Sequence, residues 1–159
     1  MGKLCLDEIR DWRQFEELAA AYFRCLPAIQ GSSLKFTEVQ TAGTGADGGV
    51  DLLVHLTLDD GILTVTRTYI VQCKFYKGSI GLRELGAGSI TDLITTHDAS
   101  GYLLICKKMA KNTLKQRFHL LSQKCRHKYS YEIWSGEEFL VKLQKAPADV
   151  LRQFFNGSL

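Results

Sequence analysis

A glycine-rich segment that runs directly into an apolar strand constrains this chain more than any other feature. Residues 43–50 have the sequence Gly-Thr-Gly-Ala-Asp-Gly-Gly-Val, and Asp51 follows them within a strand-like run over residues 50–58. An Asp-Asp-Gly turn signal then predicts a hairpin into a second β-rich run over residues 62–75. The sequence therefore predicts two paired strands, with an acid at the start of one and Lys74 near the end of the other.

The glycine segment has the spacing of a dinucleotide-binding loop, G-x-G-x-x-G, but its surroundings differ from those of such a loop. In that loop a helix must follow, because the N-terminus of the helix binds the pyrophosphate. Here residues 49–54 are strand-like and bring an acid, Asp51, to the place of the phosphate. The chain has no Gly-Lys-Ser or Gly-Lys-Thr, so a nucleotide-binding P-loop is excluded as well.

Asp51, Gln72 and Lys74 form a candidate site for metal-dependent phosphodiester hydrolysis. Strand residues alternate between faces, so Gln72 and Lys74 share one face while Cys73 enters the core. Counting through the turn places Asp51 opposite position 69, and twist, stagger or a bulge would then bring Gln72 within reach of the same ion. Oxygens of Asp51, the Gln72 amide and the Cys73 backbone carbonyl suit Mg²⁺. Lys74 would orient or help deprotonate the attacking water and stabilise the charge that grows on the phosphate.

The rest of the chain has the alternation of helices and strands that is typical of one mixed domain of 159 residues. Helices are predicted over residues 11–26, 79–97 and 112–127, further strands over residues 34–41, 102–106 and 129–134, and two short helices after Ser135 and Pro147. The order α-β-β-β-α-β-α-β-α predicts an α/β fold in which helices flank a mixed β-sheet.

Any affinity for nucleic acid must come from a local patch, because the net charge is only +3. Residues 107–128 contain eight lysines and arginines and no acid. Within this run the candidate DNA-binding residues are Lys111, Lys115, Arg117 and Lys124. A solvated helix face explains such a run about as well as a phosphate-binding surface does.

Cysteine usage and hydropathy indicate the cellular setting. The five cysteines include no C-x-x-C pair, so they predict neither a zinc site nor a disulfide framework, and they favour a reducing compartment. The N-terminal residues have no signal-peptide pattern, and no segment approaches about 18 consecutive apolar residues. We therefore expect a cytoplasmic protein with no membrane partner.

Taken together, these motifs resemble the PD-(D/E)xK nuclease superfamily, and more closely its Mrr-like restriction endonuclease branch. That branch has Phe-Glu on an N-terminal helix, a glycine-rich loop that runs into G-[IV]-D, and Q-x-K in place of E-x-K. The corresponding segments here are Phe15-Glu16, Gly49-Val50-Asp51 and Gln72-Cys73-Lys74. The resemblance covers most of residues 11–145 and extends to the strand after Gly101, the basic helix and the Trp-Ser-Gly before the next helix.

The resemblance implies a restriction-endonuclease-like fold and a Mg²⁺-dependent endonuclease of double-stranded DNA, active in restriction or anti-phage defence, with Mn²⁺ able to substitute. It implies that Asp51 and Gln72 are metal ligands and that Lys74 is the catalytic lysine. Glu16 matches the helix glutamate that supports the metal, and a solvated helix acid is an equal alternative for it. The neutral Gln72 removes one negative charge near the ion relative to E-x-K.

Domains of this branch are often fused to other modules, including large antiviral STAND NTPases in which the nuclease is an N-terminal effector. We therefore expect residues 1–159 to be one nuclease domain, with its core over residues 11–145, excised from a longer chain and acting through self-association or a fused oligomerising NTPase. The apolar C-terminal residues either pack on a following domain or cap the sheet; they are Val150, Leu151, Phe154 and Phe155. Two alternatives stay open: a catalytically silent nucleic-acid-binding or assembly module, and a Holliday-junction resolvase-like nuclease, which would need a dimer and branched DNA.

Overall fold

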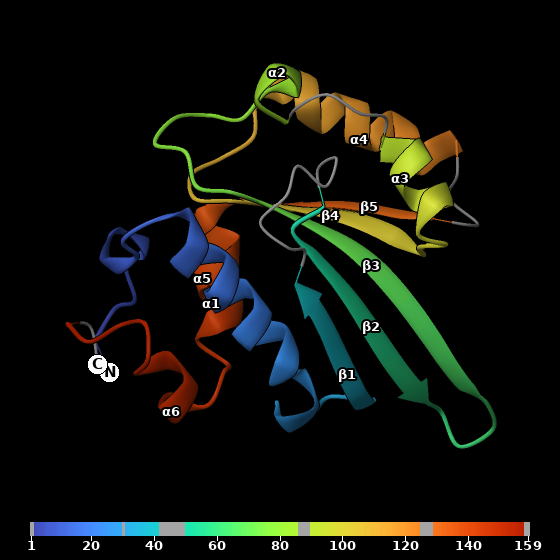
Figure 1. Ribbon diagram of the computed structural model, residues 1–159, viewed down its shortest axis with the longest axis horizontal. Coiled ribbons are helices and arrows are strands. Elements are labelled where there is room, and N and C mark those ends of the chain that lie inside the picture. The colour runs from blue at the N-terminus through green and yellow to red at the C-terminus, as the bar shows by residue number, and fades with distance from the viewer. Residues whose placement is uncertain (1, 30, 42–49, 86–89, 125–128, 158–159) are drawn as a thin grey trace.

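A single mixed sheet organises the computed structural model, which describes residues 2–29, 31–41, 50–85, 90–124 and 129–157 (Figure 1). Its strands lie in the order β1-β2-β3-β4-β5. They are β1 (Leu34–Thr41), β2 (Leu52–Asp59), β3 (Thr64–Lys74), β4 (Gly101–Cys106) and β5 (Ser130–Trp134). The first three strands form an antiparallel meander, and β4 and β5 continue the sheet parallel to β3. The predicted mixed α/β sheet is thus confirmed.

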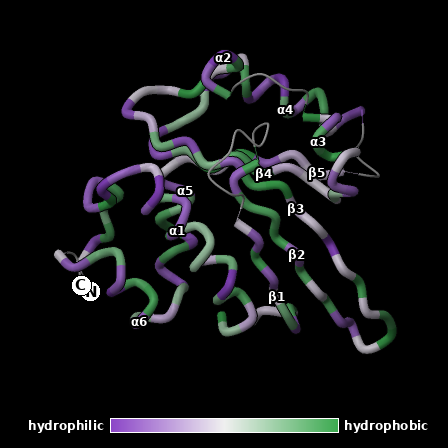
Figure 2. Tube along the Cα trace, viewed as in Figure 1, coloured by the Kyte–Doolittle hydropathy of each residue, from purple (hydrophilic) through white to green (hydrophobic). Residues whose placement is uncertain are grey.

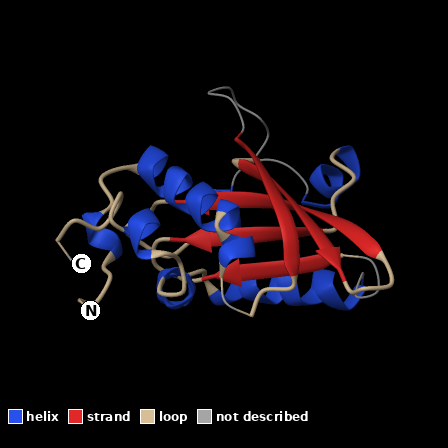
Figure 3. Cartoon of the chain, turned by 90° about the horizontal axis from the view of Figure 1, so that it is seen from below, coloured by secondary structure: helices blue, strands red, loops and turns tan. Residues whose placement is uncertain are grey.

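Helices cover both faces of the sheet (Figures 1 and 3). On one side lie α1 (Trp12–Arg24), α5 (Gly136–Leu143) and α6 (Ala148–Leu151), and on the other lie α2 (Leu82–Leu85), α3 (Ile90–Thr96) and α4 (Asn112–Lys124). Short 3₁₀ turns at Leu6–Glu8 and Leu26–Ala28 flank α1. Asp11 caps the start of α1, because its side chain accepts a hydrogen bond from the Gln14 N–H. Ser135 caps α5 in the same way, as its sequence predicts.

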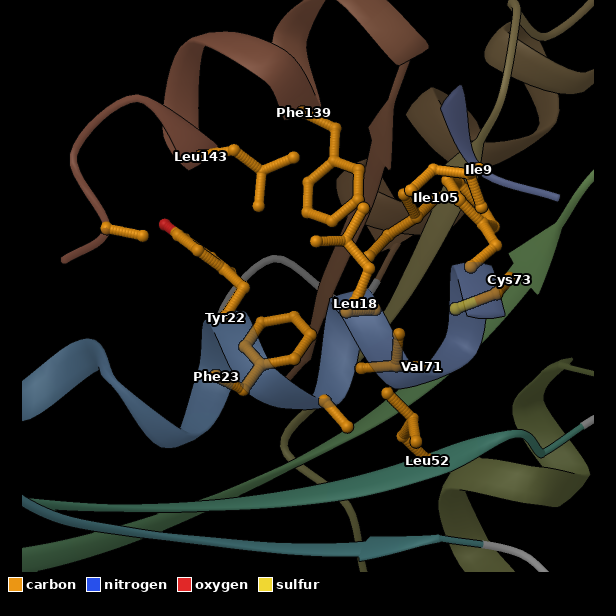
Figure 4. Close-up of a cluster of buried hydrophobic side chains, with 14 of the residues drawn as sticks. Ile9, Leu18, Tyr22, Phe23, Leu52, Val71, Cys73, Ile105, Phe139 and Leu143 are labelled. Atoms are coloured by element: carbon orange, nitrogen blue, oxygen red, sulfur yellow. The ribbon is translucent and has the colours of Figure 1, made fainter. Parts of the chain in front are cut away.

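Each face of the sheet has its own apolar core, and the apolar positions alternate along the strands as Figure 2 shows. On the α1 side, Phe15 and Phe139 meet edge to face with ring centroids 5.9 Å apart, close to buried Leu18, Val71 and Leu52 (Figure 4). On the α4 side, Leu114 and Phe118 pack against the opposite face of the sheet. All six residues of β4 are buried, because helices cover this strand on both sides.

The β2–β3 hairpin has a longer turn than the sequence suggests. Asp59 pairs with Thr64, and Leu52 pairs with Val71. The predicted partner of Asp51, position 69, is therefore wrong: the register brings Asp51 beside Gln72 without any bulge. The physical reason is that Asp60 closes a wider turn by accepting hydrogen bonds from the backbone N–H groups of Ile62 and Leu63.

The structure also bears on two further predictions, the helix over residues 79–97 and the packing of the C-terminal residues. The single helix predicted over residues 79–97 is two helices, α2 and α3, and the residues between them, 86–89, lie outside the described ranges. Leu151 and Phe155 are buried in the core on the α1 side, with Val150 and Phe154 packed against it. Of the two interpretations, the structure therefore supports the one in which the C-terminal residues cap the sheet.

Some predicted features lie outside the described ranges. These are the glycine segment over residues 43–49 with Asp47, and the end of the predicted basic helix, residues 125–127. None of the helices in the described part of the chain combines the length and the apolar character needed to cross a membrane.

Candidate active site

A pocket of about 540 Å³ lies where β3 ends, β2 begins and α1 starts. It is lined by Asp11, Trp12, Glu16, Asp51, Gln72, Cys73, Lys74, Phe75 and Tyr76. Three segments that are far apart in sequence meet here because α1 packs against the β2–β3 pair. The structure thus brings together four predicted side chains, those of Glu16, Asp51, Gln72 and Lys74, with Cys73 between the last two.

Asp51 is fixed by the strand pairing itself. Its backbone N–H donates to the Val71 carbonyl over 3.1 Å, and its Oδ2 accepts a hydrogen bond of 2.6 Å from the backbone N–H of Cys73. Burial raises the pKa of Asp51, while the Cys73 N–H and the charge of Lys74 oppose that rise. The carboxyl group is therefore held in place and poorly solvated.

Glu16 brings a second carboxyl group to Asp51 from α1. Its neighbour Phe15 is fully buried, which anchors this turn of the helix against the sheet. Burial, followed by the negative charge of Asp51, raises the pKa of Glu16 to about 7, and the protonated Glu16 donates a hydrogen bond to Asp51. When one of these two acids is ionised, its negative charge disfavours ionisation of the other, because both lie in one poorly solvated pocket. A cation between them would stabilise both ionised forms.

Gln72 has a buried polar atom without a partner. The side chain is 5% exposed, and its Oε1 accepts no hydrogen bond from the residues that the structure describes. An unsatisfied buried acceptor costs about 1–3 kcal/mol, so such an atom calls for an explanation. In a pocket with two carboxyl groups, a free amide oxygen fits a cation ligand.

Lys74 supplies the positive charge of the pocket. Its charge lowers the pKa of both Glu16 and Asp51, which places its ammonium group within electrostatic reach of both acids. The Nζ atom lies 5.9 Å from the ring centroid of Tyr76. Cys73, in contrast, directs its thiol into the core, where burial raises the pKa of the thiol, and its hydrogen bond to Asp51 is donated by the backbone N–H.

The donor set fits a hard divalent ion. Mg²⁺ takes oxygen ligands, keeps several waters and needs only one or two carboxylates. Asp51 and Glu16 could supply the carboxylates and Gln72 the neutral oxygen. Among the described residues, no three histidine, cysteine, aspartate or glutamate side chains cluster as a metal site, so a zinc-type centre has no ligand set there.

Of the predicted DNA-binding residues, Lys115, Arg117 and Lys124 lie on α4 and Lys111 directly precedes it. Lys111, Lys115, Arg117 and Lys124 are all exposed. α4 covers the face of the sheet opposite α1 (Figure 1), and none of the four lines the acid pocket. Lys111 lies 3.9 Å from a carboxylate oxygen of Glu84. The structure therefore leaves these residues as a separate basic surface.

The sequence predicted no role at this site for Lys107, which lies beside the end of β3, or for two aromatic residues that line the pocket. The Lys107 N–H donates to the Lys74 carbonyl over 3.0 Å, and its Nζ lies 4.5 Å from the Phe75 ring centroid. Trp12 and Tyr76 stand on the pocket rim, 52% and 46% exposed. The sequence signal that could have identified them is their position: Trp12 lies one turn before Glu16, and Tyr76 lies two residues after Lys74.

Comparison with known proteins identifies the family. The family model Mrr_cat, described as a restriction endonuclease, matches residues 7–116, which is more than half of the chain. The chain therefore belongs to this Mrr-like restriction endonuclease family. The matched range contains all four pocket residues that the sequence predicted. A search of curated proteins finds no significant match.

Two solved structures share the fold. The MspJI restriction endonuclease in complex with a 27-mer oligonucleotide has a TM-score of 0.56 and 12% identity, over 90% of this chain and 29% of that chain. The DNA modification-dependent restriction endonuclease AspBHI has a TM-score of 0.52 and 13% identity, over 88% of this chain and 34% of that chain. This chain thus spans about a third of the length of each.

Proposed function

We propose that this domain is a Mg²⁺-dependent DNA endonuclease whose active site is the pocket formed by Glu16, Asp51, Gln72 and Lys74. The observation that carries the proposal is the buried Oε1 of Gln72, which has no hydrogen-bond partner among the described residues, in a pocket with two carboxyl groups and a lysine. A silent module of the same fold has no physical need for such a costly arrangement. Membership of a restriction endonuclease family supports the same assignment.

Each residue has a distinct role in this proposal. Asp51 and Glu16 bind the ion through carboxylate oxygens, and Gln72 binds it through Oε1. When bound, the ion lowers the pKa of a coordinated water and neutralises charge on the phosphate. Lys74 orients the attacking water and stabilises the negative charge that develops on the phosphate oxygens. The Cys73 N–H keeps the Asp51 carboxylate in position through its hydrogen bond.

The substrate we propose is double-stranded DNA, and the setting is restriction or anti-phage defence in the cytoplasm. A DNA substrate is supported by the family and by the oligonucleotide bound to MspJI. A reducing compartment is consistent with Cys25, Cys73 and Cys106, which are buried free thiols. A drop in phage plaque number with the wild type, and none with Lys74→Ala, would support the role in defence.

Plasmid cleavage with Mg²⁺ or Mn²⁺ tests the activity. Lys74→Ala should lower the rate by about 10²–10³-fold, because one preorganised electrostatic group at the reacting phosphate is lost. Lys77→Ala is the matched control, since this lysine is exposed and does not line the pocket. Equal rates for wild type and Lys74→Ala would contradict the assigned site, and DNA binding without any cleavage would favour the silent module.

We further propose that cleavage of both strands needs two copies of the domain, through self-association or a fused oligomerising module. One pocket can cut one strand at a time, and pairing two copies raises the effective concentration of sites on one duplex. The rate should then rise faster than linearly with protein concentration, with nicks as the main product at low concentration. Efficient double-strand cutting by a proven monomer would contradict this, and a preference for four-way junctions would favour the resolvase.

A further inference from the structure

Trp12 and Tyr76 flank the acid pocket as two exposed aromatic rings. Trp12 is the first residue of α1 and Tyr76 follows β3, so the two rings come from different segments and meet at one pocket. Their side chains are 52% and 46% exposed. Elsewhere in the described part of the chain, Phe36 on β1 is the one other aromatic residue exposed to this extent, at 57%. Exposed aromatic rings are thus concentrated at the candidate site.

Each of these two rings has a cation beside it. The guanidinium carbon of Arg13 lies 5.2 Å from the Trp12 ring centroid, and the Nζ of Lys74 lies 5.9 Å from the Tyr76 ring centroid. Each cation lies over one face of its ring. A base can therefore stack on the other face of the ring while the phosphate of the same nucleotide pairs with the cation. Phe36 has no such cation among the described contacts.

We propose that Trp12 and Tyr76 stack on the bases of the nucleotides that flank the scissile phosphate, so that the preferred sites within double-stranded DNA are those where these nucleotides are unpaired. The inference rests on the proposed function, because it takes the pocket beside Lys74 as the phosphate site. In a paired duplex, neighbouring bases cover each other's faces, so a base must leave the stack before it can contact a ring. That step costs least at a mismatch or in a single strand.

Three DNAs of the same sequence test the proposal: a single strand, a duplex with a short mismatched bubble, and a fully paired duplex. Binding is measured in EDTA, by anisotropy of labelled DNA, so that cleavage does not enter the result. Wild type should bind the bubble and the single strand more tightly than the paired duplex. Trp12→Ala should weaken binding to the first two by roughly 5- to 150-fold, the range of one base stacked on one ring. Trp12→Phe should keep most of the affinity, because it keeps a ring.

Phe36→Ala is the matched control, since it removes an equally exposed ring away from the pocket, and its affinities should equal those of wild type. Tryptophan fluorescence gives a second readout: a thymine oligonucleotide should quench wild type more than Trp12→Phe, because stacking quenches the indole of Trp12. Equal wild-type affinity for bubble and paired duplex, or equal weakening of both by Trp12→Ala, would overturn the proposal. The Lys74→Ala cleavage test is independent of these binding results, so failure of the stacking and failure of the nuclease assignment can be distinguished.

Discussion

The backbone N–H of Cys73 donates a hydrogen bond of 2.6 Å to the Oδ2 of Asp51. This bond joins the end of β3 to the start of β2, so the pairing of the two strands determines where the Asp51 carboxylate points. The same strand end carries Gln72 and Lys74 on either side of Cys73. One register therefore aligns three of the four proposed active-site residues.

Asp51→Asn should abolish Mg²⁺-dependent cleavage while the fold survives. The asparagine keeps an oxygen that can accept the Cys73 hydrogen bond, and it removes a poorly solvated negative charge next to Glu16. Without metal, the variant should therefore be at least as stable as wild type in thermal unfolding. Asp51→Ala also loses the hydrogen bond and should be about 1 kcal/mol less stable than Asp51→Asn. Wild-type cleavage by Asp51→Asn would show that the carboxylate is not a ligand.

Gln72→Glu should lower the Mg²⁺ or Mn²⁺ concentration needed for half-maximal cleavage, because a third carboxylate strengthens the ion's binding. Without metal, the same variant should be destabilised by at least about 1–3 kcal/mol, since the new carboxyl group is buried beside two others. Added Mg²⁺ should restore that stability. Destabilisation with no gain in metal affinity, measured by titration of both proteins, would mean that Gln72 has only a structural role.

Stability and metal affinity should depend on pH in opposite directions. The pKa of Glu16 is raised from 4.5 to about 7 in the folded protein, so between these values the folded state binds more protons than the unfolded state. Without metal, the free energy of unfolding should therefore fall as pH rises from about 5 to about 7. Mg²⁺ must displace that proton, so its affinity should rise over the same range. Glu16→Gln should flatten the Glu16 part of both dependences, which thermal unfolding and calorimetric titration can measure.

The salt dependence of DNA binding can show whether the basic residues on α4 contact DNA phosphates. Each phosphate contact that is lost should flatten the plot of log affinity against log salt by about 0.9. A double change of Lys115 and Arg117 to alanine should therefore flatten it by up to about 2, with a similar loss of affinity for all DNA sequences. The matched control is the double change of Lys145 and Arg152, which are exposed residues next to α5 and α6. Equal slopes for both variants would mean that α4 presents a solvated face.

Local patterns in the sequence were enough to predict most elements. β1 begins and ends where the apolar alternation predicts, and α4 begins at Asn112 as the helical spacing indicates. The capped start of α5 follows from Ser135, because a cap depends on residues only three positions apart. Such features are determined within a few residues, so a single sequence contains the information. The sequence did not predict that residues 79–97 contain two helices, α2 and α3.

The candidate site likewise combines features that the sequence predicts with features that depend on the fold. The strand pattern pointed to Asp51, Gln72 and Lys74, and the family resemblance added Glu16; the structure brings these four into one pocket. The true pairing of Asp51 was not predictable, because it depends on a turn that widens through hydrogen bonds to Asp60. Three further features were not predictable either: the lack of a partner for Gln72 Oε1 among the described residues, the raised pKa of Glu16, and the presence of Trp12 and Tyr76 at one pocket.

The sequence by itself therefore determined most of the elements, their order and the identity of the four residues that make up the candidate site. Only the tertiary structure decided the surroundings of these residues. It determines that Glu16 is poorly solvated, that Gln72 Oε1 has no donor among the described residues, and that two aromatic rings line the pocket. The physical reason is that burial and electrostatic coupling act between segments that only the fold brings together, here α1 against the β2–β3 pair.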